Sequence, residues 1–177
     1  MRILIRMTAL AAVSWLAVSP PAFAHIVLAE PHAAPGSHYA AFFRVGHGCD
    51  GQATTALRIE IPVNVTDARP QPKAGWTLTV ERAPLPKPIT VKGKEIRERV
   101  AAVTWRGHLG DDEFDQFGLL VHLPDAVGTL YFPVVQICEK SEMRWTDIPV
   151  EGQDAAHPAP ALDIGGDAMS GMEHMHH

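Results

Sequence analysis

Period-two alternation decides the fold class of this chain, and it is clearest in residues 56–62, Ala56-Leu57-Arg58-Ile59-Glu60-Ile61-Pro62. In an extended backbone, the aliphatic residues of this stretch share one face and its charged residues share the other. Such a strand buries one face against a core and leaves the other face in water. The stretch therefore predicts a strand of a sheet that is covered on one side.

Further strands are predicted on both sides of this stretch. Residues 38–45, 76–81 and 100–105 alternate in the same way or are rich in aromatic and β-branched side chains. Residues 117–123 and 130–137 are more continuously apolar, which predicts central strands buried on both faces.

Glycine and proline clusters predict the turns between these strands, at residues 46–51, 70–75, 84–88 and 107–112. The charged residues 94–99 are expected to continue a hairpin, and no segment predicts a long helix. We therefore predict an all-β fold, namely an antiparallel β-sandwich of immunoglobulin-like or cupredoxin-like shape.

The first 24 residues have the pattern of a signal peptide. Arg2 and Arg6 precede an apolar run from residue 7 to about residue 18, and Ala22-Phe23-Ala24 offers small residues for cleavage. The run is short for a membrane span and no second run follows, so an uncleaved anchor is the lesser alternative. We expect a periplasmic or otherwise exported protein whose mature chain begins at His25.

Composition limits the number of domains and the class of partner. Cleavage would leave 153 residues with 13 basic and 20 acidic side chains, a formal charge of −7, which suits one domain with its own core. The alternation stops after about Pro149, so we predict a domain over residues 25–150 and a flexible tail over residues 151–177. The chain has no basic patch, and nucleic acid is not an expected partner.

The two cysteines, Cys49 and Cys138, predict a disulfide because an even number in an exported chain favours pairing. A bridge closing a loop of roughly 90 residues stabilises a fold by about 4–5 kcal/mol in the chain-entropy model. The alternative is ligation of a metal by thiolates.

His25 is the first candidate metal ligand. A histidine at the start of a chain offers its α-amine and its ring Nδ1 in chelating position, and such nitrogens suit copper(II). Glu30, His32 and His38 follow closely and are candidate further ligands. The alternative is that the histidine follows the cleavage site by accident.

A second candidate lies at the end of the chain, where soft thioethers and imidazoles gather. We predict a weak, flexible site for copper(I) or copper(II) there. Its candidate ligands are Met169, Met172, His174, Met175, His176 and His177. His122, which lies within an apolar segment, is instead expected to be a core residue, as are Trp76 and Trp105. Sequence motifs of hydrolases, phosphate-binding loops and zinc proteases are absent, so no enzyme is predicted.

An ordered set of short motifs runs through about residues 25–150. It includes His25-Ile26-Val27-Leu28, Gly48-Cys49-Asp50-Gly51, Pro72-x-x-Gly75-Trp76, Tyr131-Phe132-Pro133-Val134-Val135-Gln136, Cys138-Glu139 and Arg144-Trp145. Together these motifs resemble the YcnI-like family of bacterial exported copper-binding proteins.

The resemblance implies a β-sandwich that holds copper(II) in a mono-histidine brace, through the α-amine and Nδ1 of His25. It also implies a tryptophan against the copper, which corresponds to Trp145. A carboxylate is common in the family at about the position of His32, whereas the acid here is Glu30. The third ligand therefore stays open between Glu30, His32, another acid and water.

Two functions follow as hypotheses. The first is a periplasmic copper(II)-binding protein, a metallochaperone or copper-homeostasis factor that exchanges copper with other periplasmic copper proteins or a copper-transporting membrane protein. The second is a copper-dependent oxidative enzyme, which would need a second histidine at the brace. A structural sandwich without a metal is a third reading.

Overall fold

The computed structural model describes residues 25–91, 93–150 and 153–166, and all its regular elements are strands. Within these residues there is no helix of the length and apolarity needed to cross a membrane. The predicted signal peptide and the predicted Met/His-rich ligands at the end of the chain lie outside the described residues.

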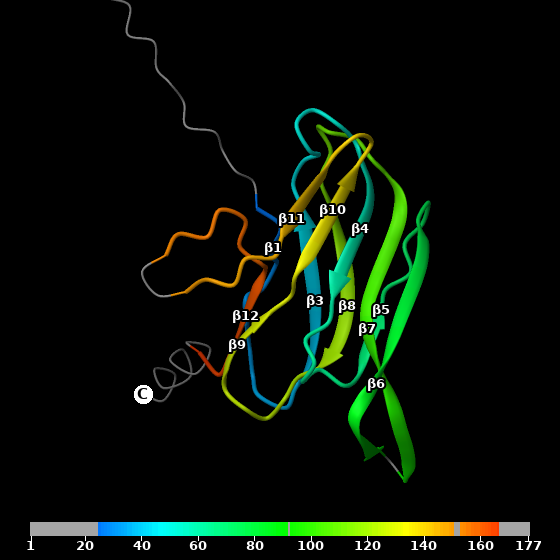
Figure 1. The fold of residues 1–177 in the computed structure, drawn as a ribbon, viewed down its shortest axis with the longest axis vertical. Coiled ribbons are helices and arrows are strands. Elements are labelled where there is room, and N and C mark those ends of the chain that lie inside the picture. Colours follow the sequence, from blue (N-terminus) through cyan, green and yellow to red (C-terminus); the bar gives the residue numbers. More distant parts are fainter. Residues whose placement is uncertain (1–24, 92, 151–152, 167–177) are drawn as a thin grey trace, which may run out of the picture.

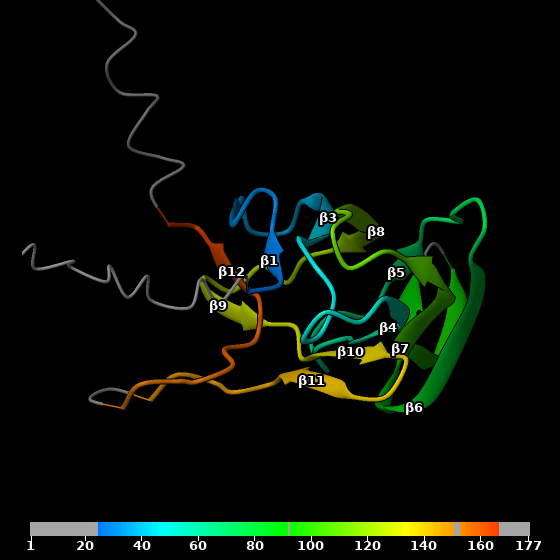
Figure 2. The same cartoon turned by 90° about the horizontal axis from the view of Figure 1, so that it is seen from above.

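Two sheets form the body of the domain and face each other in two layers (Figures 1 and 2). The first sheet has the order β1-β3-β8-β5 and the second has the order β11-β10-β4-β7-β6. The strands of the first are β1 (Val27–Leu28), β3 (His38–Val45), β8 (Asp115–His122) and β5 (Ala68–Pro70). Those of the second are β11 (Glu142–Trp145), β10 (Val134–Cys138), β4 (Thr54–Glu60), β7 (Lys94–Leu109) and β6 (Thr77–Val91). The predicted all-β sandwich is confirmed.

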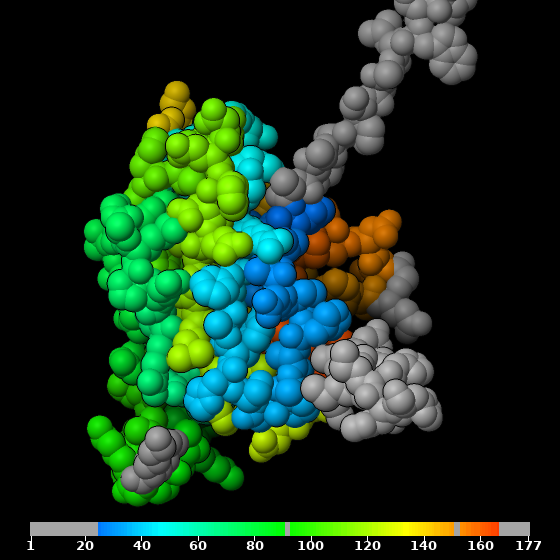
Figure 3. All heavy atoms as spheres, turned by 180° about the vertical axis from the view of Figure 1, so that it is seen from behind, coloured from blue at the N-terminus to red at the C-terminus, as the bar shows by residue number. Residues whose placement is uncertain are grey.

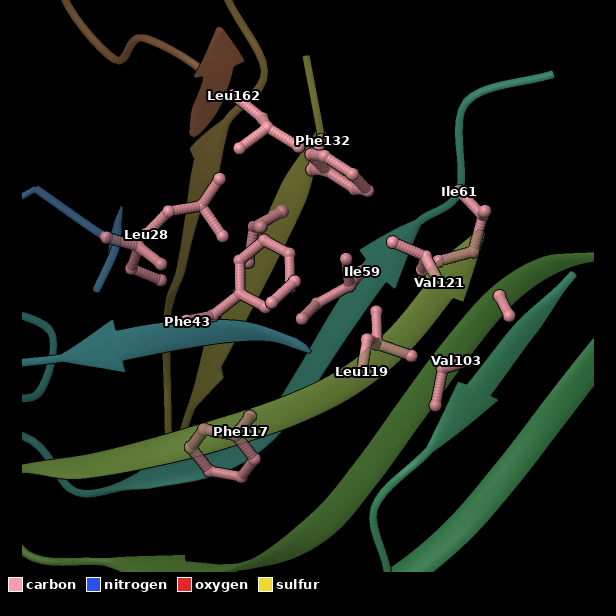
Figure 4. Close-up of a cluster of buried hydrophobic side chains, with 14 of the residues drawn as sticks. Leu28, Phe43, Ile59, Ile61, Val103, Phe117, Leu119, Val121, Phe132 and Leu162 are labelled. Carbon is pink, nitrogen blue, oxygen red and sulfur yellow. The ribbon is translucent and has the colours of Figure 1, made fainter. Parts of the chain in front are cut away.

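The core fills the space between these sheets because the inward residues of each strand alternate with outward ones. In β3, for example, Tyr39, Ala41, Phe43 and Val45 are buried. Figure 4 shows apolar side chains from both sheets pointing into this shared space. Burial of this kind stabilises the fold by about 25 cal/mol per Å² of apolar surface removed from water.

A third, small sheet lies beside β1 at one side of the sandwich (Figure 2) and corrects the predicted domain boundary. It has the order β2-β12-β9, formed by β2 (His32–Ala33), β12 (Ala161–Ile164) and β9 (Gly128–Tyr131). β12 runs parallel to β2 and antiparallel to β9, and it buries Leu162 and Ile164 completely. The predicted tail therefore begins too early, since the domain continues to residue 164.

One further predicted segment differs from the structure. Prolines 84, 86 and 88 were expected to mark a turn, but they lie within β6, where the pairing with β7 is irregular between Pro84 and Ile89. β6 is an edge strand, and an edge tolerates residues that have no N–H to donate. The charged residues 94–99 continue the β6–β7 hairpin, as predicted.

The two predicted central strands differ from the structure. Residues 130–137 do not form one strand, because they are divided between β9 in the small sheet and β10 in the second sheet, where β10 is buried along most of its length. One face of β8 is exposed to solvent, and Leu120 and His122 lie on it. His122 is therefore not the core residue that was predicted, because Val121 and Leu123 on either side take the inward positions. Trp105 is fully buried as predicted, whereas Trp76 is half-buried against Phe117.

The predicted disulfide joins Cys49, in the turn after β3, to Cys138, the last residue of β10. The turn itself is tight: Asp50 and Gly51 both have positive φ angles, 50° and 75°, and Cys49 pairs with Gln52. Asp-Gly is the residue pair that such turns favour. The bridge therefore ties one sheet to the other beside β4.

Candidate metal centre

Trp145 is the residue around which the candidate site is built. It ends β11, pairs with Val134 of β10 and is 1% exposed. Its indole N–H donates to Oε1 of Gln136 at 3.4 Å. A buried indole needs such a partner for its polar end, and the partner also restricts the rotation of the ring.

Gln136 is itself fixed by a buried hydrogen-bond network. Its Nε2 donates to the carbonyl oxygen of His47 at 2.8 Å and to Oγ1 of Thr54 at 2.8 Å. Gln136 and Thr54 are both essentially inaccessible to solvent. The network therefore links the indole of Trp145 to β4 and to the turn that carries the disulfide.

His25 contacts this indole from the other end of the chain. The centroids of the two rings are 5.4 Å apart and their planes meet at 64°. His25 is half-buried, and the next residues anchor it, because Ile26 and Leu28 enter the core while β1 pairs with β3. The structure thus brings together the two residues that the resemblance singled out.

A second histidine, His157, contacts the same indole and was missed by the sequence analysis. Its ring centroid is also 5.4 Å from that of Trp145, at an interplanar angle of 64°. The backbone N–H of His157 donates to Oδ2 of Asp147 at 2.9 Å, and the N–H of Asp147 donates to the carbonyl of His157 at 3.0 Å. Residue 157 falls within the predicted tail, and no local pattern distinguishes it from a solvated histidine.

A shallow hollow lies beside His25. Its volume is about 320 Å³, and it is lined by residues 25–28, by Pro31 and by residues 158–161. Most of these side chains are apolar. The hollow therefore gives His25 solvent access on a side that is bordered by the segment leading from His157 into β12.

The other predicted ligands near the start of the chain have different neighbours. Glu30 is exposed, and its backbone carbonyl accepts a hydrogen bond from the hydroxyl of Tyr39. Burial, and after it the charge of Glu30, raises the pKa of Tyr39 to about 12. His32 lies on β2 with its Nδ1 3.7 Å from Oδ2 of Asp163 on β12. His38 contacts His122. No group of three or more His, Cys, Asp or Glu side chains is placed to hold a metal in the part of the chain that the structure describes.

The chemistry available here is that of borderline nitrogen donors. The imidazole of His25 is accessible, and cleavage after Ala24 would add an α-amine to the same residue, so two nitrogens could chelate one ion. Trp145 has no lone pair to donate, and its ring can offer only an electron-rich face or a barrier to water. The predicted third ligand stays a prediction, to which the structure adds His157 as a further candidate.

Comparison with known proteins adds a family and a fold. A family model described as "Domain of unknown function (DUF1775)" matches residues 25–164. The crystal structure of an uncharacterized protein from Nocardia farcinica, described as revealing an immunoglobulin-like fold, is similar with a TM-score of 0.60 and 30% identity. The similarity covers 79% of this chain and 97% of that chain. No curated protein matches.

Proposed function

The chain belongs to the DUF1775 family, and from this premise we propose that it is an exported copper(II)-binding protein. In this proposal the mature chain begins at His25 and holds one copper(II) ion through its α-amine and Nδ1. Copper(II) is the divalent ion that such nitrogens bind most tightly. The resemblance to YcnI-like proteins supports the same ligand set.

The observation that carries the proposal is the contact between His25 and Trp145, whose ring centroids are 5.4 Å apart. The two residues are separated by most of the domain, yet separate elements of the fold bring them together. The indole is buried and its N–H is bonded to Gln136, so a ring edge or face is presented to the histidine in a fixed orientation. A rigid apolar wall beside a chelating residue excludes water from one side of an ion and leaves the other side for ligand exchange.

The remaining ligand positions suit exchange rather than permanent storage. Glu30, His32, His157, another acid and water are the candidates, and Nδ1 of His32 already lies 3.7 Å from Oδ2 of Asp163. An ion held mainly by one residue at the mouth of a hollow can pass to a partner without unfolding of the domain. We therefore propose a metallochaperone or copper-homeostasis role, with other periplasmic copper proteins or a copper-transporting membrane protein as partners. The Met/His-rich residues at the end of the chain would capture copper weakly before transfer.

We propose binding rather than catalysis. An oxidative enzyme with a histidine brace would need a second histidine, and the two that lie close in sequence have other partners: His32 faces Asp163, and His38 faces His122. His157 is the residue that could still support the enzymatic alternative. Consumption of oxygen by the copper-loaded protein with a reductant and a polysaccharide would favour that alternative.

The test uses the mature protein, residues 25–177, titrated with copper(II) and followed by electron paramagnetic resonance. We expect one equivalent to bind with a nitrogen-rich signal that is lost in His25→Ala. The matched control is the mature chain with its α-amine acetylated, which keeps the imidazole of His25 but removes the amine as a ligand; its signal should also be lost. Copper should quench the fluorescence of the mature chain, and less so in Trp145→Phe. Unchanged binding in both His25→Ala and the acetylated chain would overturn the proposal.

A further inference from the structure

A pair of histidines on the opposite sheet is arranged as a second metal site. His38 begins β3 and His122 ends β8, and the two are direct partners in the antiparallel register of these strands. The two positions are 84 residues apart in the chain, and no pattern in the sequence indicates that they meet.

The hydrogen bonds around the pair show that it occupies the position where side chains approach most closely. The N–H of Leu123 donates to the carbonyl of Ser37 at 2.9 Å, whereas the N–H of His122 points away from β3 and donates to the carbonyl of Asp67 at 3.1 Å. His38 and His122 are therefore a non-hydrogen-bonded pair, in which Cα atoms lie about 4.5 Å apart instead of about 5.5 Å.

Both side chains point to solvent on the outer face of the first sheet, the face opposite to the core. Figure 3 shows this side of the molecule, where the blue residues of β3 lie beside the yellow-green residues of β8. The ring centroids of His38 and His122 are 4.9 Å apart and the ring planes meet at 67°. Nothing in the described part of the chain covers the two rings.

This spacing suits two imidazoles that share one ion. A metal bound to one nitrogen of each ring at about 2.0–2.1 Å would hold the ring centroids roughly 4.5–5.2 Å apart, for bond angles between square and tetrahedral. The observed 4.9 Å lies within that interval. We infer that His38 and His122 form a surface site for an imidazole-binding divalent ion, with copper(II) bound most tightly.

The site offers an ion only two side-chain ligands, and this number determines how tightly the ion binds. Among the described residues no third His, Cys, Asp or Glu completes a cluster there. Asp67 lies next to His122 on the side away from His38, and its carboxylate forms an ion pair with Arg69. The ion would keep water in its other positions, bind more weakly than at a chelating terminus and exchange readily. This inference does not depend on the function proposed for His25.

The experiment uses the mature chain carrying His25→Ala together with His174→Ala, His176→Ala and His177→Ala, so that both proposed copper(II) sites at the ends of the chain are absent. Copper(II) is added as the probe, binding is measured by calorimetry, and the imidazole signals of individual histidines are followed by nuclear magnetic resonance. We expect one equivalent that broadens the signals of His38 and His122 first. Replacing either by alanine should weaken this binding at least about tenfold, since even loss of a residue that only supports a ligand costs 10–100-fold.

His108→Ala is the matched control, because His108 is an exposed histidine on strand β7. This variant should still bind one equivalent of copper(II). Thermal unfolding of the three variants shows whether each is folded, and replacements on an exposed face should change stability little. Equal binding by His38→Ala, His122→Ala and His108→Ala, or no broadening of the His38 and His122 signals, would overturn the inference and leave an edge-to-face contact of two rings.

Discussion

Replacement of Gln136 by methionine tests whether the buried network holds the indole of Trp145. Methionine has a similar length but cannot replace the amide. The change removes two hydrogen bonds of 2.8 Å, to His47 and Thr54, and one longer bond of 3.4 Å from the indole N–H. Each good bond contributes about 1 kcal/mol, and each buried group left without a partner costs about 1–3 kcal/mol.

The net loss of stability is smaller than the sum of these costs. Methionine at position 136 has no amide, so the folded variant no longer has to remove an amide from water. We expect Gln136→Met to lower the free energy of unfolding by about 3 kcal/mol. For a chain of this size that corresponds to a fall in Tm of about 6–12 °C. Urea unfolding of the oxidised mature protein measures the first quantity, and calorimetry measures the second. Gln153→Met is the control, since Gln153 is exposed, and it should change stability by less than about 0.5 kcal/mol.

A double-mutant cycle with Trp145→Phe assigns part of the loss to the indole. Gln136→Met leaves the indole N–H of Trp145 without a partner. Phenylalanine has no N–H, so the double variant contains no such unpaired donor. The two changes should therefore cost about 1 kcal/mol less together than the sum of their separate costs. Strict additivity, or equal stability of Gln136→Met and Gln153→Met, would refute the view that Gln136 fixes this ring.

Two further predictions concern the strand that extends the domain and the buried tyrosine. Leu162→Ala should lower the free energy of unfolding by about 2–5 kcal/mol, because Leu162 is 0% exposed. The control Val150→Ala, at a side chain 58% exposed, should be nearly neutral in the same urea experiment, and equal effects would mean that β12 does not support the fold. The raised pKa of Tyr39, about 12 against an ordinary value of 10.0, means that the folded chain keeps a proton that the unfolded chain releases. Stability should therefore fall between about pH 10 and pH 12 by up to about 1.4 kcal/mol per pH unit, and Tyr39→Phe should remove this component. A variant with the same pH slope as the parent would contradict that assignment.

Local patterns in the sequence determined a large part of this fold. Alternation placed β3, β4, the start of β6 and residues 100–105 of β7, because a strand with one buried face shows its period without any knowledge of its partners. The cysteine count predicted the bridge between Cys49 and Cys138, and the Asp-Gly pair marked the turn beside it. Trp145 was singled out by resemblance to a family and not by any physical pattern in its own segment.

Other features depended on partners far away in the chain. Ala161–Ile164 is short and follows a proline-rich segment, so its four residues look like a tail until β2 and β9 supply the neighbours that bury it. The prolines of β6 resemble a turn until the sheet order shows that the strand lies at an edge. His122 belongs to an apolar run, and only the register of β8 turns it outward.

The sequence by itself determined that the chain forms a β-sandwich, and it marked His25 as a chelating residue if cleavage follows Ala24. Only the tertiary structure decided what surrounds that histidine: the indole of Trp145, the network behind it and the imidazole of His157 beside it. It also decided that His38 faces His122. The physical reason is that hydrophobic periodicity acts over a few neighbouring residues, whereas these contacts come from strand register and packing between segments far apart in the chain.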